Sequence, residues 1–219
     1  VISCILTTVN ARWHGPVRRI AEALAAWVPV TVVLFLIDRL GWEHIFEWIN
    51  HPVESKAAWL NTSRVFYTDL AVFVASAVLT ICFLYHSLRP GLKGSADKAS
   101  LAKGMFARWS ANWRGDAEEA ERSKVITAKL AVALLFLFAF GYTLVGFDLV
   151  MSMEPLWYSN LFGAYFSWGA FLSAVCVTTL ISVLHCLSPG LLGHITVARR
   201  HDLGKMIFAF SIFWMYLFW

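Results

Sequence analysis

Four long apolar stretches constrain the fold of this chain more than any other feature of its sequence. Crossing the roughly 30 Å hydrocarbon core of a bilayer takes about 20 mostly apolar residues in a helix that rises about 1.5 Å per residue. The stretches that approach or exceed this length are residues 20–37, 65–88, 125–150 and 161–187. Residues 1–9 and 203–219 have the composition of parts of two further spans. The sequence therefore predicts an all-α fold, a polytopic bundle of transmembrane helices that forms a single membrane domain over residues 1–219.

The composition agrees with a lipid environment and argues against a soluble enzyme. Of the 219 residues, 59% are hydrophobic and 15% are charged, against about 45–50% and about 25% in soluble domains. The four cysteines have no framework spacing and the prolines number six, which argues against a disulfide scaffold and a disordered chain. Because the sequence opens without a Met and closes inside an apolar run, we expect it to be the interior of a longer membrane protein.

The distribution of Lys and Arg predicts the orientation of the spans. Fourteen of the 18 basic residues lie in the connections 10–19, 89–124 and 188–205, three lie in 38–64 and none lies in 151–160. Cytoplasmic loops of membrane proteins carry the excess of Lys and Arg. We therefore expect the first three connections, including the long connection 89–124, to be cytoplasmic. The net charge of +4 then reflects membrane topology, and no nucleic-acid partner is expected.

Ionisable residues in or near the predicted spans are the candidates for function, because charge inside a bilayer is costly and commonly marks an ion or proton pathway. They fall into two sets near opposite faces of the membrane. The periplasmic-side set is Asp69, Asp148 and Glu154, and the cytoplasmic-side set is Glu22, Lys129, His86 and His185. Hydroxyl side chains, Tyr142 among them, lie between the two sets. This pattern predicts two polar half-paths for protons that meet near the middle of the membrane.

Asp148 is the strongest single candidate. It ends the most apolar span, and Pro155 shortly after it predicts irregular backbone. Irregular backbone at membrane depth is tolerated only where it is buried in protein or lines a cavity. An alternative interpretation is purely structural: Lys129 and the histidines reach the lipid headgroups, and Asp69 pairs with Arg64.

A nine-residue pattern occurs twice, as His86–Gly94 and His185–Gly193. Each copy carries a Pro-Gly pair, which predicts the end of a helix because proline lacks the N–H that continues it. The repeat is also consistent with a duplicated helical hairpin, which the matching histidines at equal depth slightly favour. The two histidines at similar depth leave open a b-type haem held between His86 and His185, whereas the sequence has no motif of a metal site.

Four segments in chain order carry a family resemblance, namely Arg18–Ala23, Lys56–Asn61, Gly146–Tyr165 and His201–Ser211. The last two are the more specific. Together they resemble the ActF subunits of bacterial alternative complex III, which belong to the NrfD/PsrC-like membrane subunits of quinone-linked respiratory enzymes. Where that signature often has a His after the proline, this sequence has Leu156, which makes a quinol site in this chain less expected. Asp148 and Trp157 are the residues that such a site would use.

The resemblance implies a bundle of about ten helices in the bacterial inner (cytoplasmic) membrane, of which this chain holds the interior. It implies partners that carry the redox centres, haem c and iron–sulfur clusters: a multihaem cytochrome c and an iron–sulfur subunit. A sister NrfD-like subunit (ActC), small anchors and a terminal oxidase complete the expected partners. The resemblance implies that the complex oxidises quinol, with menaquinol as the expected substrate, and we expect this chain to bind no cofactor and to contribute a proton path.

Two functions of other classes fit the same residues. An ion-coupled secondary transporter would use the two polar sets for coupling. A b-type haem membrane anchor would use His86 and His185.

Overall fold

The computed structural model describes residues 1–11, 13, 15–92, 115–186 and 195–219, and within them all regular structure is helical. Four helices in these ranges are long and apolar enough to cross a membrane, namely Val17–Ile45, Thr62–Gly91, Asp116–Met153 and Phe162–Leu184. They overlap the four long stretches predicted from the sequence. The prediction of an all-α helical bundle is confirmed, and the chain is a helical membrane protein.

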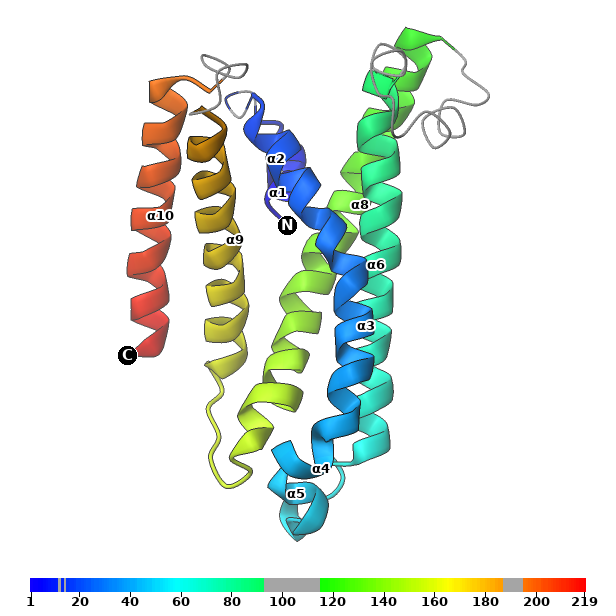
Figure 1. Ribbon diagram of the computed structural model, residues 1–219, viewed down its shortest axis with the longest axis vertical. Coiled ribbons are helices and arrows are strands. Elements are labelled where there is room, and N and C mark those ends of the chain that lie inside the picture. Colours follow the sequence, from blue (N-terminus) through cyan, green and yellow to red (C-terminus); the bar gives the residue numbers. More distant parts are fainter. Residues whose placement is uncertain (12, 14, 93–114, 187–194) are drawn as a thin grey trace.

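The long helices lie roughly along one direction (Figure 1). In chain order the helices are α1 (Ile2–Thr8), α2 (Val17–Leu24), α3 (Val28–Asp38), α4 (Trp42–Ile45), α5 (Glu47–Asn50), α6 (Thr62–Leu92), α8 (Asp116–Val145), α9 (Phe162–Cys186) and α10 (Val197–Phe218). Helices α9 and α10 pack together on one side, α3, α6 and α8 form the other side, and α1 and α2 lie between the two groups. We call the end at which α2, α8 and α10 begin the basic end, and the opposite end the α4–α5 end. The connections predicted to be cytoplasmic leave from the basic end, and their orientation in the membrane stays a prediction.

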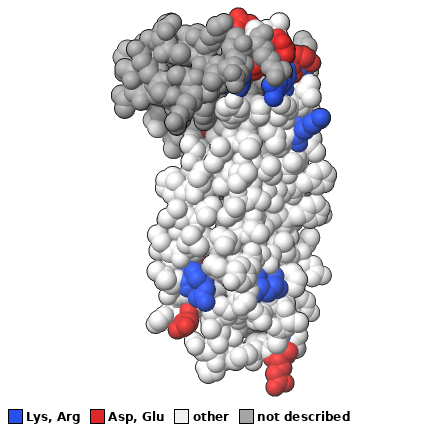
Figure 2. Space-filling view, turned by 90° about the vertical axis from the view of Figure 1, so that its right-hand side faces the viewer, with Lys and Arg blue, Asp and Glu red and all other residues white. Residues whose placement is uncertain are grey.

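The outer surface between the two ends is apolar. On the face shown in Figure 2, charged side chains lie mainly toward the two ends and leave an uncharged band between them. Large outward-facing side chains at mid-helix include Val33, Val78 and Phe136, each more than half exposed. Such a band is the surface that a bilayer covers.

Among the described residues, Pro29 in the first turn of α3 and Pro90 inside α6 each leave one backbone carbonyl without its usual helical donor. In the turn η1 (Ala25–Trp27), which joins α2 to α3, the Ala25 carbonyl accepts from the Val28 N–H, because Pro29 has no N–H to offer. Helix α6 contains Pro90 and continues to Leu92, so the predicted helix end at Pro90 is wrong.

The carbonyl that Pro90 leaves free belongs to His86, four residues earlier. It accepts a hydrogen bond from the Ser123 hydroxyl of α8. A neighbouring helix thus supplies the donor that the proline lacks, which lets the helix run on. Most of the second copy of the repeated pattern, residues 187–193 including Pro189, lies outside the described residues.

Aromatic packing closes the α4–α5 end. The buried cluster consists of Phe35, Trp42, Phe46, Trp48 and Val65, which come from α3, α4, α5, α6 and the residue between α4 and α5. The Trp42 indole donates to Asp38 over 3.0 Å. This cluster fixes the N-terminal end of α6, on which two of the charged residues described below are carried.

Small residues set the approach of α9 to α8. Gly163 packs directly against Thr143, so a side chain at this glycine would have no room. The hydroxyl oxygens of Ser167 and Thr143 lie 3.4 Å apart. This is the small-residue packing by which helices associate in lipid.

Candidate functional site

Asp148 lies on a distorted turn at the end of α8. Residues Gly146–Val150 form a π-helical turn, and a 3₁₀ turn, Met151–Met153, follows it. A Cβ at Gly146 would lie 2.9 Å from the ring of Phe166, so glycine permits the close approach of α9 at this point. The Asp148 side chain is completely buried, and its carbonyl accepts the Ser152 hydroxyl. Wide turns of this kind often occur at functional sites, where they redirect a side chain.

The Asp148 carboxylate forms a two-point ion pair with Arg64 of α6. The two guanidinium nitrogens donate to the two carboxylate oxygens over 2.9 and 2.7 Å. The same guanidinium donates to the Trp59 carbonyl over 2.6 Å and lies 4.2 Å from the centre of the Trp59 ring. Arg64 is thus held by the carboxylate, by a backbone carbonyl and by an aromatic ring. Its two parallel hydrogen bonds to Asp148 are the arrangement in which arginine binds carboxylates most strongly.

Asp69 lies next to this pair on α6 and has no hydrogen-bond partner. The residue is completely buried, and neither carboxyl oxygen meets a donor among the described residues. The charged groups that act on it are Asp148 and Arg64. The alternative in which Arg64 pairs with Asp69 is therefore wrong, because the guanidinium reaches across to α8. Two carboxyl groups share one arginine here, and only one of them is bonded to it.

Glu154 and Trp157 lie outside this arrangement. Both side chains are exposed, and Trp157 packs edge-on against Phe162, with ring centres 5.6 Å apart. The backbone after Met153 is irregular up to α9, as Pro155 predicts. Lys56 ties this segment down by donating to the Pro155 carbonyl over 2.7 Å. Of the predicted periplasmic-side set, the structure brings together Asp69 and Asp148.

At the basic end, Glu22 is buried and accepts four hydrogen bonds. One carboxylate oxygen accepts from Arg18 over 2.9 Å, Ser3 over 2.9 Å and Ser87 over 2.6 Å. The other oxygen accepts from Arg19. The Ser87 hydroxyl also accepts from Arg18 over 3.1 Å. One carboxylate is therefore surrounded by two arginines and two hydroxyl groups, drawn from α1, α2 and α6.

The rest of the predicted cytoplasmic-side set does not join Glu22. Lys129 is exposed on α8. His86 packs against the neighbouring Tyr85 ring, with ring centres 5.0 Å apart. The side chain of His185 lies outside the described residues, so the haem ligation proposed for the two histidines stays a prediction. Within the described ranges, no group of three or more His, Cys, Asp or Glu residues is placed to hold a metal ion.

A second buried ion pair at the basic end was not predicted from the sequence. Arg89 of α6 pairs with Glu119 of α8 over 2.8 Å, and both side chains are nearly buried. Glu119 was assigned to a cytoplasmic connection because α8 was expected to begin at residue 125. Three acidic residues within four positions, Asp116, Glu118 and Glu119, are the signal of an earlier helix start that the sequence does carry.

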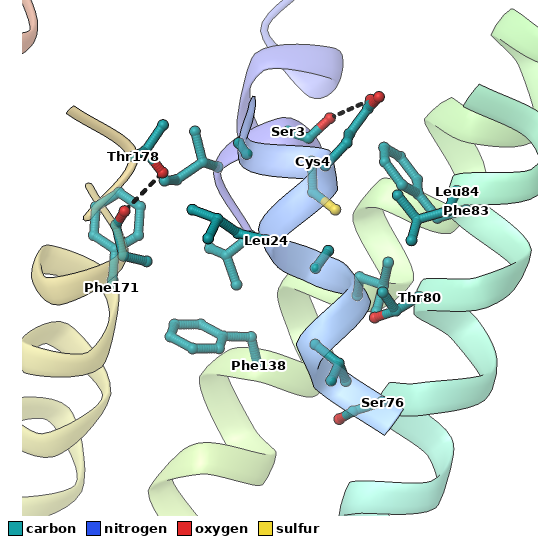
Figure 3. A pocket seen from close by; sticks show the side chains of 18 of the residues that line it. Ser3, Cys4, Leu24, Ser76, Thr80, Phe83, Leu84, Phe138, Phe171 and Thr178 are labelled. Atoms are coloured by element: carbon teal, nitrogen blue, oxygen red, sulfur yellow. Dashed lines mark hydrogen bonds between the residues drawn. The ribbon is translucent and has the colours of Figure 1, made fainter. Parts of the chain in front are cut away.

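A cavity of about 230 Å³ lies between the two charged ends, in the basic half of the bundle. Helices α1, α2, α3, α6, α8 and α9 all contribute to its wall (Figure 3). Its polar lining consists of Ser3, Glu22, Ser76, Thr80, Tyr142 and Thr178. The Ser3 hydroxyl and Glu22 meet at its edge, and Thr80 and Ser76 follow along α6.

The fold and the site together define a class: a helical membrane protein with a buried charged cluster near each end and, between them, a mainly apolar cavity that a few polar side chains line. Compared with known proteins, the chain matches no family model and no curated protein. The assignment of a function therefore depends on the site and on the sequence resemblance.

Proposed function

We propose that this chain is an integral membrane subunit of a quinol-oxidising respiratory complex and that it provides a transmembrane path for protons. The observation that carries the proposal is Asp69, a completely buried carboxyl group without a hydrogen-bond partner beside the Arg64–Asp148 pair. A buried ionisable group is costly unless it is paired. A carboxyl group that is left unpaired at such a cost is a group suited to bind and release a proton.

The polar residues of α6 support a path that runs along this helix. Asp69, Ser76, Thr80 and Ser87 are separated by seven, four and seven residues, spacings close to whole helical turns, so they lie on one face. The face spans about 27 Å at about 1.5 Å per residue, most of the hydrocarbon thickness. It begins at the unpaired carboxyl group and ends at Ser87, which donates to Glu22.

The resemblance to ActF subunits supplies the proposed setting. The segments that carry it include Asp148 and Glu22, the carboxylates of the two buried clusters. In this setting the haem c and iron–sulfur centres belong to partner subunits in the bacterial inner membrane, and this chain moves protons while its partners move electrons.

The test of the setting is the composition of the native assembly. The full-length protein, tagged in its own membrane and purified gently, should retain a multihaem cytochrome and an iron–sulfur subunit in fixed ratio, as read by mass spectrometry and haem stain. A polypeptide that purifies alone and takes up a substrate would contradict the proposal and favour an ion-coupled transporter.

The test of the proton path is Asp69→Asn in the assembled complex. Asparagine keeps the shape of the side chain but cannot release a proton, so the number of protons translocated per electron should fall while electron transfer continues. Glu43→Gln is the matched control, because Glu43 is an exposed acid at the same end of the bundle. Unchanged proton-to-electron stoichiometry in Asp69→Asn would contradict the path. Asp148→Asn is a poorer test, because it leaves the Arg64 charge without its partner.

A further inference from the structure

The charge of Arg64 acts on two buried carboxyl groups, but its guanidinium bonds only one of them. We propose that Trp59 is a positioning residue of the proton path: it holds the Arg64 guanidinium on Asp148 and thereby keeps Asp69 free to exchange a proton. This role of Trp59 rests on the proposed function, in which Asp69 carries the proton.

The first step is a count of charges. Among the described residues, the charged groups that act on Asp69 are Asp148 and Arg64. Both carboxyl groups are completely buried, so two ionised carboxylates would leave one negative charge that a single arginine does not offset. An uncompensated buried charge is costly. The carboxyl group that Arg64 does not bond is therefore the one that holds a proton, and a proton can be exchanged there.

The second step is that Arg64 has donors left with which it could also bond Asp69. A guanidinium has five N–H groups. One of them donates to the Trp59 carbonyl and two donate to Asp148. Arg64 and Asp69 lie on the same helix, about 7.5 Å apart along its axis, and helical side chains lean toward the N-terminal end of their helix. A side chain at position 69 therefore leans toward the turn that carries Arg64, and another contact is needed to hold the guanidinium on Asp148.

Trp59 supplies that contact. Its carbonyl accepts from the Arg64 Nε over 2.6 Å, and the centre of its ring lies 4.2 Å from the guanidinium carbon. Arginine stacks on aromatic faces in this way. The bond at Nε and the stacked ring together fix the plane of the guanidinium. The two outer nitrogens are then kept in the parallel arrangement that fits the Asp148 carboxylate.

The segment that carries Trp59 is itself held in place. The Trp59 N–H donates to the Lys56 carbonyl over 2.9 Å, and the Trp59 carbonyl also accepts from the Asn61 N–H over 3.0 Å. The Asn61 side chain accepts from two N–H groups of the first turn of α6, as an N-cap residue does. The Lys56 side chain donates to the Pro155 carbonyl. Trp59 is thus fixed both to the start of α6 and to the segment that follows α8.

The proton step itself involves one carboxyl group. Asp69 takes up a proton from a donor on one side of the path and gives a proton to an acceptor on the other side, so its carboxyl group ends as it began. Arg64 keeps its charge and Asp148 stays ionised throughout. If the guanidinium turned toward Asp69, its positive charge would favour the ionised form of that carboxyl group, and the exchange would stop.

Infrared spectroscopy of the assembled complex tests this role. A protonated carboxyl group has a C=O stretching band that an ionised one lacks, and the band that disappears in Asp69→Asn belongs to Asp69. Trp59→Leu removes the ring, so we expect it to lose the Asp69 band. We also expect the number of protons translocated per electron to fall to the level of Asp69→Asn. Trp59→Phe keeps an aromatic face and should restore both relative to Trp59→Leu. Trp27→Leu is the matched control, because Trp27 is an exposed tryptophan outside the cluster.

An Asp69 band and a stoichiometry that both persist in Trp59→Leu would overturn the positioning role. Arg64→Lys decides the question if the tryptophan variant does not assemble. Lysine keeps the positive charge, but it has neither the planar fork that fits a carboxylate nor a flat face that stacks on a ring. The Asp69 band should therefore be lost in Arg64→Lys as well, and a band that persists there would equally overturn the role.

The outcomes separate the role of Trp59 from the proposed function. If Asp69→Asn leaves the proton-to-electron stoichiometry unchanged while Trp59→Leu loses the band, Trp59 positions Arg64 but the proton path through Asp69 is wrong. If Asp69→Asn lowers the stoichiometry while Trp59→Leu changes neither readout, the proton path stands and the positioning role is overturned. A wild-type complex without an Asp69 band would also overturn the positioning role, because Arg64 would then not leave Asp69 free.

Discussion

The two buried charged clusters have opposite balances of charge. At the α4–α5 end, Asp69 and Asp148 share a single arginine, Arg64. In the Glu22 cluster at the basic end, one carboxylate receives two arginines and two hydroxyl groups. The basic-end carboxylate is therefore fully hydrogen-bonded, whereas the opposite end keeps one carboxyl group without a donor. A fully bonded charge holds helices together, and an unpaired one is available for exchange.

Of the substitutions considered for the two clusters, the removal of Arg64 should cause the largest loss of folding stability. Arg64→Met leaves Asp148 buried without its partner, and breaking a buried pair from one side costs about 3–5 kcal/mol of stability. Thermal or denaturant unfolding in detergent measures the loss. The double variant Arg64→Met/Asp148→Leu removes both charges and should recover most of it. A double variant as unstable as the single one would show that the pair is not coupled.

Removing the carboxylate of the basic end should cost less. Glu22→Gln removes the negative charge and one of the two acceptor oxygens that Arg18 and Arg19 bind, but both arginines are partly exposed and can turn toward water. We expect a loss of about 2 kcal/mol, in the range found for hydrogen bonds to charged groups. The measurement is the same unfolding experiment, with Ser87→Ala as a smaller step of about 1 kcal/mol. A loss equal to that of Arg64→Met would mean that the two clusters are equally buried in the membrane.

The close contact of α6 with α8 at Val72 and Gly141 predicts a third, intermediate loss of stability. Gly141→Ala forces a methyl group against Val72, and overpacking of this kind costs about 1–3 kcal/mol. Gly204→Ala is the matched control, because it lies in α10 with nothing within 4 Å of the added Cβ. It should be neutral or should gain up to about 1 kcal/mol from helix propensity. Similar unfolding midpoints for the two variants would show that α6 and α8 can separate here without cost.

Replacing the unpaired carboxyl group should change stability least. Asp69→Asn removes an ionisable group that no donor satisfies, so we expect a change within about 1 kcal/mol in either direction. The same variant should lower proton translocation, so the expected result is a loss of function without a matching loss of stability. Unfolding measured beside proton-to-electron stoichiometry checks both readouts on one sample. A large loss of stability would show that Asp69 has a bonded structural role.

The helices could be predicted from the sequence because each long apolar run is itself the requirement for a membrane span. The pairing of charges could not be predicted in the same way. Arg64 and Asp69 are close in sequence, but which of them meets Asp148 depends on the register between α6 and α8 and on the π-helical turn at Gly146–Val150. Neither the register nor the turn has a sequence signal of its own.

Other parts of the site could be predicted from the sequence only in part. Arg18, Arg19 and Glu22 have the three- and four-residue spacings of a helical ion-pair cluster, but the donors Ser3 and Ser87 come from distant segments. Proline at position 90 was interpreted as a helix end, and the structure shows why that fails: a hydroxyl on another helix takes the place of its missing N–H.

That hydroxyl has a mechanical consequence. Helices α6 and α8 are joined by Ser123 and His86, and by Arg89 and Glu119, at the basic end, and by Arg64 and Asp148 at the other. Sliding one helix along the other by a single turn would break all three contacts at once. We therefore expect α6 and α8 to move as one rigid unit. A movement that gives access first to one face of the membrane and then to the other would then involve the helices that pack against this pair, α1, α3 and α9.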